Sequence, residues 1–226
     1  MISKYKPVLA PKRIQKTNGE MIAAADAFHK AMVDRRTIRD YKDDPVAADV
    51  IKQCIKTAGM APSGANHQPW HFVAISNPDL KRQIREAAEK EEEQFYAGGA
   101  GDEWISALEP IGTGPSKPHL TTAPWLIVVF AERYGVREDG SHYKNYYVPE
   151  SVGIATGMLL TALHMAGLST LTHTPNPMAF LTEICGQPRS NKPTMIITVG
   201  HQADSAEIPE IALKKKPLEG VLTLME

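Results

Sequence analysis

The sequence predicts one α/β or α+β domain in which helices flank a central sheet. Segments with apolar residues at helical spacing alternate along the chain with short, continuous apolar runs that are typical of buried strands. The 226 residues, 42% hydrophobic and 23% charged, suffice for one domain with a sizeable core. A net charge of −1 provides no field that would favour nucleic acid or an anionic membrane. No apolar run approaches the roughly 20 residues that span a bilayer.

The first part of the chain contains an arm, three helices and a strand. Residues 1–20 hold too few apolar side chains to pack alone, so we expect an extended arm before a domain at 21–226. Apolar residues at helical spacing predict a helix over 21–33, and a second helix opens at Pro45 and breaks at Gly59. The run 72–75 predicts a strand, and Asn77-Pro78 caps a long helix that continues to Tyr96.

The middle of the chain holds a buried strand between irregular segments. Glycines at 97–101 interrupt the long helix, and a short helical turn is expected at 104–108. The Gly- and Pro-rich stretch 112–118 cannot pack as a regular element. The apolar run 125–130 predicts a buried strand, whereas the polar and aromatic segment 134–147 reads as a surface loop.

The last part completes the sheet. The most apolar helix covers 152–166 and ends at Gly167, a favourable C-terminal cap. Strands are then expected at 168–174 and 195–200, with a short helix at 178–184 between them. A final strand is expected at 221–224.

Cysteine and histidine usage argues against a disulfide or a metal centre. Cys54 and Cys185 both stand in apolar surroundings, which favours two free thiols in a reduced compartment. The eight histidines are scattered, and none forms a cluster at metal-ligand spacing. The N-terminal 16 residues lack the apolar stretch of a secretory signal, so we expect a cytoplasmic protein.

The run Arg35-Arg36-Thr37-Ile38-Arg39 is the densest chemical signal in the chain. Guanidinium groups bind phosphate oxygens two at a time, so this run suggests the phosphate of a cofactor. The alternative is a basic helix terminus that complements the helix dipole. Because no nucleophile elbow, Walker loop or GxGxxG motif is present, an enzymatic reaction here would need a cofactor's reactive group. The turn Ser63-Gly64-Ala65 could approach a flat cofactor ring closely, since Gly64 has no side chain.

From about Met21 to the C-terminus the chain resembles the FMN-dependent nitroreductase superfamily, and within it the iodotyrosine deiodinase group. The arginine run is similar to the family's Arg-Arg-Ser-x-Arg flavin motif, with Thr37 at the serine. The segment through Pro62-Ser63-Gly64-Ala65 resembles its second flavin loop, and Thr172-His173-Thr174 falls at a threonine triplet before proline. The resemblance implies FMN held by the following residues: Arg35, Arg36, Thr37, Arg39, Pro62, Ser63, Gly64, Thr172, His173, Thr174 and Lys215.

Three residues narrow the resemblance to the deiodinases. In that family a Glu, a Tyr four residues later and a Lys in a mobile lid hold the amino-acid zwitterion of the substrate, and these fall on Glu92, Tyr96 and Lys117. Residues i and i+4 share a helix face, so Glu92 and Tyr96 can face one ligand. The resemblance also places the substrate phenolate oxygen near the Ala65 backbone N–H. By itself, however, an acidic run such as Glu89–Glu93 is typical of a solvated helix face.

The resemblance carries further expectations. It implies an α+β fold with a central mixed sheet flanked by helices, in an intertwined homodimer with exchanged terminal arms and FMN at the subunit interface. It implies reductive dehalogenation of halotyrosines, in which Thr174 donates a hydrogen bond to flavin N5. Animal members carry a membrane anchor that has no counterpart here.

Two residues depart from the family pattern. His173 replaces the middle threonine, and its ring would either alter the flavin's surroundings or point away. Lys215 replaces an arginine, so a forked phosphate contact becomes a point charge. Two other functions remain open: a general nitroreductase or quinone reductase that uses NAD(P)H, and a non-enzymatic flavin-binding or ligand-sensing protein. The electron donor is unknown.

Overall fold

The computed structural model describes residues 5–99 and 101–226, and the chain divides after Arg35 into two units. The first unit contains one helix, α1 (Asn18–Val33), after an extended segment. A capping box fixes its start, because Thr17 Oγ1 accepts from Glu20 N–H and the Glu20 carboxylate accepts from Thr17 N–H. Residues 1–4 of the expected arm and residue 100 of the expected interruption lie outside the described part.

The second unit is built on one antiparallel sheet with strand order β1-β2-β6-β5. Its strands are β1 (Trp70–Ile75), β2 (Trp125–Glu132), β5 (Ser169–His173) and β6 (Asn191–Gly200). The segment around Thr37 adds one isolated parallel bridge to this sheet, between Thr37 and Thr170 on the outer side of β5. The expected mixed sheet is therefore antiparallel in its four strands and parallel only at this bridge.

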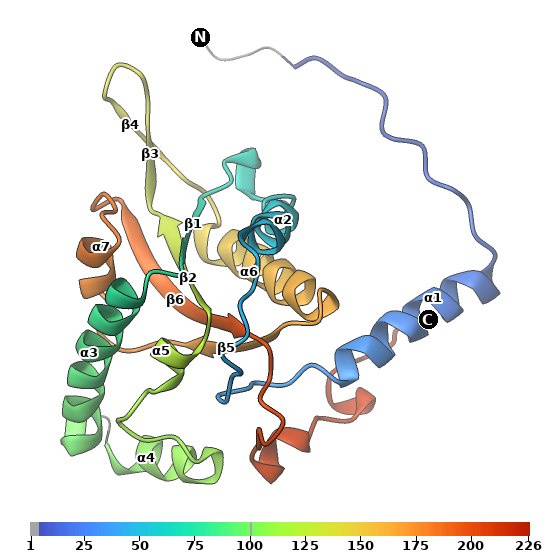
Figure 1. The fold of residues 1–226 in the computed structure, drawn as a ribbon. Helices are drawn as coiled ribbons and strands as arrows, with labels where there is room; N and C mark the ends of the chain where they lie inside the picture. Colours follow the sequence, from blue (N-terminus) through green and yellow to red (C-terminus); the bar gives the residue numbers. More distant parts are fainter. Residues whose placement is uncertain (1–4, 100) are drawn as a thin grey trace. The chain divides into compact units, whose positions relative to one another are not determined.

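Helices cover both faces of the sheet, as Figure 1 shows. On one face α2 (Ala48–Ala58) and α6 (Val148–Met165) pack against Ile127, Val129 and Ile197. On the other face α3 (Pro78–Gln94) and α7 (Phe180–Ile184) pack against Leu126, Val128, Phe130 and Ile196. Successive β2 side chains enter the two cores alternately, as expected for a strand that is buried on both faces. The remaining helical segments are η1 (Gly64–Asn66), η2 (Phe95–Gly99), α4 (Asp102–Leu108), η3 (Glu109–Ile111), α5 (His119–Thr122), η4 (Glu210–Leu213) and η5 (Leu218–Gly220).

Two expected elements were wrong. The segment 134–147 is not a loop but contains a hairpin of β3 (Tyr134–Val136) and β4 (His142–Lys144). In its cross-strand pair Gly135–Tyr143, the tyrosine ring covers the glycine backbone. The polar composition of the segment does not predict this pairing. The segment 221–224 is not a strand, because no ladder partner is present among the described residues and only the turn η5 precedes it.

The other elements confirm the predicted order, with shifted ends. Helix α6 begins four residues before the expected start, with Pro149 in its first turn, and β6 extends back to Asn191. The long helix after Asn77 is α-helical to Gln94 and continues through Tyr96 as the π-helical turn η2. Cys54 and Cys185 are free, as expected. Within the described residues no helix combines the length and apolarity needed to cross a membrane.

Candidate active site

The arginine run is an extended segment attached to the edge of β5. Helix α1 ends at Val33 with Asp34 as its C-cap, so the run begins directly beyond the helix terminus. Ile38 is buried, and its N–H donates to Thr170 O at 3.1 Å beside the parallel Thr37–Thr170 bridge. Because the two segments run parallel, Arg39 follows Thr37 in the direction in which Thr172 follows Thr170. This register brings two motifs from distant parts of the sequence to one place.

That place is a cavity of about 260 Å³. Its wall includes Arg39 and the β5 end with Thr172, His173 and Thr174. The opposite wall comes from the end of α3 and from η2, and the segment that leads into α5 closes it. Lining residues used below are Arg39, Glu92, Tyr96, Lys117, His119 and His173.

The three residues expected to hold a substrate zwitterion meet in this cavity. Lys117 Nζ lies 3.1 Å from Glu92 Oε2, and their side chains are only 4% and 13% exposed. Lys117 Nζ also donates to Thr113 Oγ1 at 3.2 Å, while the Tyr96 hydroxyl donates to Thr113 O at 3.1 Å. The Lys117 ammonium stands 5.7 Å from the centre of the Tyr96 ring. One buried anion, one buried cation and one phenol therefore line the same space.

Two histidines form the polar floor beside this ion pair. His173 points inward, with Nε2 3.9 Å from Glu92 Oε1, and its ring packs edge-on against His119 at 5.5 Å between centroids. Burial, followed by the charges on His119, Lys117 and Arg39, lowers the pKa of His173 to about 3. Burial, followed by Lys117, lowers the pKa of His119 to about 4. Both rings are therefore neutral near pH 7.

Sequence reasoning missed Glu89, which anchors the segment carrying Lys117. Its Oε1 accepts from the Lys117 backbone N–H at 2.6 Å, from Arg85 Nε at 2.9 Å and from Ser116 Oγ at 3.4 Å. Glu89 and Glu92 are three residues apart on α3 and share one helix face. The sequence of the acidic run does not distinguish the anchoring role of Glu89 from the ion-pairing role of Glu92, because neighbouring glutamates differ only in the helix face that they occupy.

The substitution Glu89→Gln is expected to loosen Lys117 and to change the acid sensitivity of the protein. Burial raises the pKa of Glu89, but hydrogen bonds from Lys117 and then Arg85 outweigh it and leave the pKa below its ordinary value. With a lowered pKa, the ionised carboxylate stabilises the fold above the unfolded-state pKa, and this is lost as the pH falls through the folded-state pKa. Melting temperatures of the wild type and Glu89→Gln should thus converge in acid and separate at neutral pH. The exposed Glu93→Gln is the control, and a constant difference at every pH would contradict the prediction.

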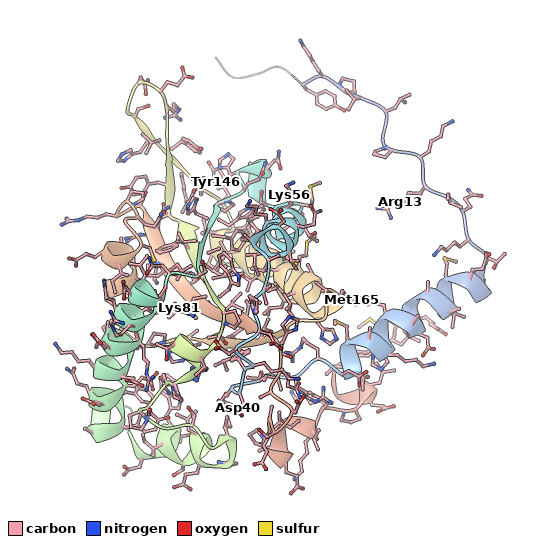
Figure 2. The ribbon with its side chains drawn as sticks, viewed as in Figure 1. Arg13, Asp40, Lys56, Lys81, Tyr146 and Met165 are labelled. Atoms are coloured by element: carbon pink, nitrogen blue, oxygen red, sulfur yellow. The ribbon has the colours of Figure 1, made fainter. Side chains whose placement is uncertain are left out.

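The second motif expected to bind flavin lies elsewhere in the chain. Gly64 N–H donates to Ser151 Oγ at 3.3 Å on α6, and a Cβ on Gly64 would lie 2.6 Å from Tyr146 O. Only glycine permits this approach, and the next residue, Ala65, is left-handed at φ 52°. Figure 2 labels Tyr146 and Asp40, the neighbour of Arg39, at opposite ends of the sheet. Pro62, Ser63, Gly64 and Ala65 do not line the cavity that holds Glu92.

The remaining predicted site residues are divided in the same way. Thr172 and Thr174 line the cavity, with His173 between them. Lys215 is exposed after η4 and does not line it. Arg35 closes the first unit and Arg36 opens the second. A single chain thus gathers the predicted substrate residues with Arg39 and the β5 end, and leaves the Ser63 loop and Lys215 apart from them.

The chain is similar in sequence to known proteins. Residues 32–201 match the model of the nitroreductase family. The chain is 45% identical to an iodotyrosine deiodinase of Haliscomenobacter hydrossis, over 94% of this chain and 96% of that protein. It is 39% identical to human iodotyrosine deiodinase 1, over 90% of this chain and 70% of that protein.

A solved structure gives the same likeness in three dimensions. A crystal structure of oxidised iodotyrosine deiodinase bound to FMN and 3-iodo-L-tyrosine superimposes with a TM-score of 0.71 at 29% identity, covering 88% of this chain and 98% of that chain. An FMN-bound nitroreductase of Bacteroides fragilis, at 20% identity and a TM-score of 0.64, shares the fold. The chain belongs to the nitroreductase family, in which it groups with the iodotyrosine deiodinases.

Proposed function

We propose that this protein is an FMN-dependent oxidoreductase that removes halogen reductively from halotyrosines, converting iodotyrosine to tyrosine and iodide. The observation that carries the proposal is the buried Glu92–Lys117 pair in the cavity beside Tyr96. The likeness to iodotyrosine deiodinases over nearly the whole chain supports it. We expect the protein to act in the cytoplasm, where its two free thiols would stay reduced.

The ion pair explains the choice of an amino-acid substrate. Glu92 and Lys117 neutralise each other in the ligand-free chain, so neither charge is buried alone. A zwitterion can replace this single pair by two, with its ammonium on Glu92 and its carboxylate on Lys117 and the Tyr96 hydroxyl. A ligand with only one of the two charges would leave a buried partner uncompensated, which costs about 1–3 kcal/mol or more. The cavity therefore favours zwitterions over ligands that carry only one of the two charges.

The residues present fit an FMN site. Arg39 lies on a segment that is hydrogen-bonded to β5, and its guanidinium suits the phosphate. The family resemblance adds Arg35, Arg36 and Lys215 to the phosphate site. The Thr172–Thr174 end of β5 lines the cavity, where Thr174 would donate to the flavin ring nitrogen N5. Once reduced, FMN would supply the two electrons for cleavage of the aryl carbon–halogen bond, and a proton would take the place of the departing halide.

The chain's own residues would bind and orient the substrate. Glu92, Tyr96 and Lys117 fix the amino-acid end and so aim the halogenated ring. The segment 112–118, anchored by Glu89, would exclude water when it closes over the ligand. The Ala65 backbone N–H would stabilise a phenolate oxygen as a fixed donor that needs no reorganisation.

We further propose that the site is completed by a second copy of the chain. The Ser63-Gly64-Ala65 loop does not line the cavity of its own chain, so we expect it to act at the cavity of a partner. Helix α6 offers a face for such a partner, because Ile154 is exposed and Cβ atoms at Gly153 or Gly157 would meet no neighbour within 4 Å. Light scattering of the purified protein should give twice the mass of one chain.

The test is an anaerobic turnover. The FMN-loaded protein is reduced chemically, 3-iodotyrosine is added without oxygen, and tyrosine and iodide are measured. Equal amounts of tyrosine and iodide are expected. Absence of tyrosine, together with rapid nitroarene reduction by NADPH, would identify a general nitroreductase, and bound FMN without either activity would identify a flavin-binding or sensing protein. Either result would overturn the proposal.

A further inference from the structure

Two buried ring nitrogens in the cavity have no hydrogen-bond partner. They are Nε2 of His119 and Nε2 of His173, and within the described residues no other buried side-chain nitrogen or oxygen shares this condition. The residues are 5% and 8% exposed and both line the cavity. A buried polar atom without a partner costs about 1–3 kcal/mol. Such atoms in a native fold need an explanation, and a ligand that supplies the partner is the simplest.

The position of His173 indicates which part of a ligand it meets. Its Nε2 lies 3.9 Å from Glu92 Oε1, which is too long for a direct hydrogen bond. The same gap suits a shared donor, because one nitrogen can lie at about 2.9 Å from both atoms at once. The other oxygen of Glu92 is the one paired with Lys117. Glu92 Oε1 and His173 Nε2 could thus act together as acceptors for a second cation.

We propose that His173 is a substrate-binding residue whose Nε2 accepts a hydrogen bond from the substrate ammonium, next to Glu92. The inference rests on the proposed function in that the ligand is an amino acid. An ammonium has three N–H donors, and one carboxylate oxygen satisfies only one of them well. A second acceptor at this spot holds the ammonium in one orientation. The departure from the family's threonine triplet therefore falls within the substrate site and not merely beside the flavin.

The charges around His173 favour this role. The groups that face it are Glu92 from α3, His119 from α5, Lys117 from the segment before α5, and Arg39 from the same wall as His173. Burial above all, and then the nearby cationic groups, keep the imidazole neutral. A neutral imidazole with its proton on Nδ1 presents a lone pair at Nε2, whereas a protonated ring would repel an ammonium. His119, which is held neutral in the same way, packs against the ring and limits its rotation.

The test compares two ligands on the FMN-loaded protein by equilibrium dialysis. One ligand is 3-iodotyrosine, and the other is 3-(4-hydroxy-3-iodophenyl)propanoic acid, which lacks only the amine. His173→Phe keeps an aromatic ring but removes the acceptor, so it should weaken 3-iodotyrosine about tenfold and leave the acid unchanged. His173→Gln, with an amide oxygen as acceptor, should restore part of the preference for the amine. His142→Phe, on the exposed hairpin, is the matched control.

Each outcome decides between the two proposals. Equal weakening of both ligands by His173→Phe, or no weakening of either, would overturn the role of His173 while iodotyrosine turnover still supports the proposed function. If the wild-type protein binds iodotyrosine but does not dehalogenate it, and His173→Phe loses the preference for the amine, the role of His173 is supported and the proposed function is overturned. Failure of the wild-type protein to bind either ligand would overturn both.

Discussion

Replacing Glu92 with glutamine should weaken binding of 3-iodotyrosine by about a hundredfold while FMN remains bound. Truncating one partner of a buried charge pair costs about 2–5 kcal/mol, and each 1.4 kcal/mol is about tenfold in affinity. Glutamine keeps nearly the shape of Glu92 but cannot neutralise an ammonium. It also leaves Lys117, whose side chain is 4% exposed, without its carboxylate. The measurement is equilibrium dialysis of the FMN-loaded protein with 3-iodotyrosine.

The matched control for this prediction is Glu93→Gln. Glu93 is the next acidic residue along α3, but it is exposed and does not line the cavity. It should bind 3-iodotyrosine as the wild type does, and both variants should reduce a nitroarene at similar rates because that substrate needs no ammonium site. A Glu92→Gln protein that keeps both its flavin and its normal affinity for iodotyrosine would remove Glu92 from the substrate site.

Local sequence patterns could predict the part of the site that lies within one element. Glu92 and Tyr96 are four residues apart, and the helix and its π-helical extension carry both into the cavity. The resemblance added Lys117, for which no local pattern exists in a Gly- and Pro-rich segment. The role of Glu89 could not be predicted, because it depends on a backbone N–H that lies 28 residues further along the chain. The periodicity of the sequence carries no information about such a contact.

Long-range register was equally hidden. The parallel bridge between Thr37 and Thr170 places Arg39 beside the end of β5, but the local sequence of neither segment predicts that they pair. Likewise, the inward direction of His173 follows from its place in β5, where alternate residues face opposite sides of the sheet. The hairpin at 134–144 did carry a usable signal in Asp139-Gly140, since Gly140 adopts φ 81° at the turn. The surrounding charges and aromatic residues concealed it.

The second large effect is expected at Arg39, where Arg39→Gln should reduce FMN affinity by about tenfold to a hundredfold. A hydrogen bond to a charged group contributes about 1.5–3 kcal/mol, and a guanidinium can make two to one phosphate. The structure presents Arg39 from a rigid segment. The neighbouring Ile38 N–H is bound to Thr170, and the Tyr41 hydroxyl lies 2.8 Å from Ile38 O and 2.6 Å from Thr198 Oγ1. Little backbone entropy is therefore lost when Arg39 binds the cofactor.

Flavin content after dialysis, followed by titration with FMN, measures the effect. Arg39→Lys should fall between the wild type and Arg39→Gln, because a lysine keeps the charge but loses the forked geometry. Arg82→Gln serves as the control, since Arg82 is exposed on α3 and pairs with Asp79 on the surface, at 2.7 Å. If Arg39→Gln retained wild-type FMN affinity, the phosphate would have to be held without the residue that the Thr37–Thr170 bridge brings to the cavity. The pairing of the arginine run with β5 would then stabilise the fold without contributing to FMN binding.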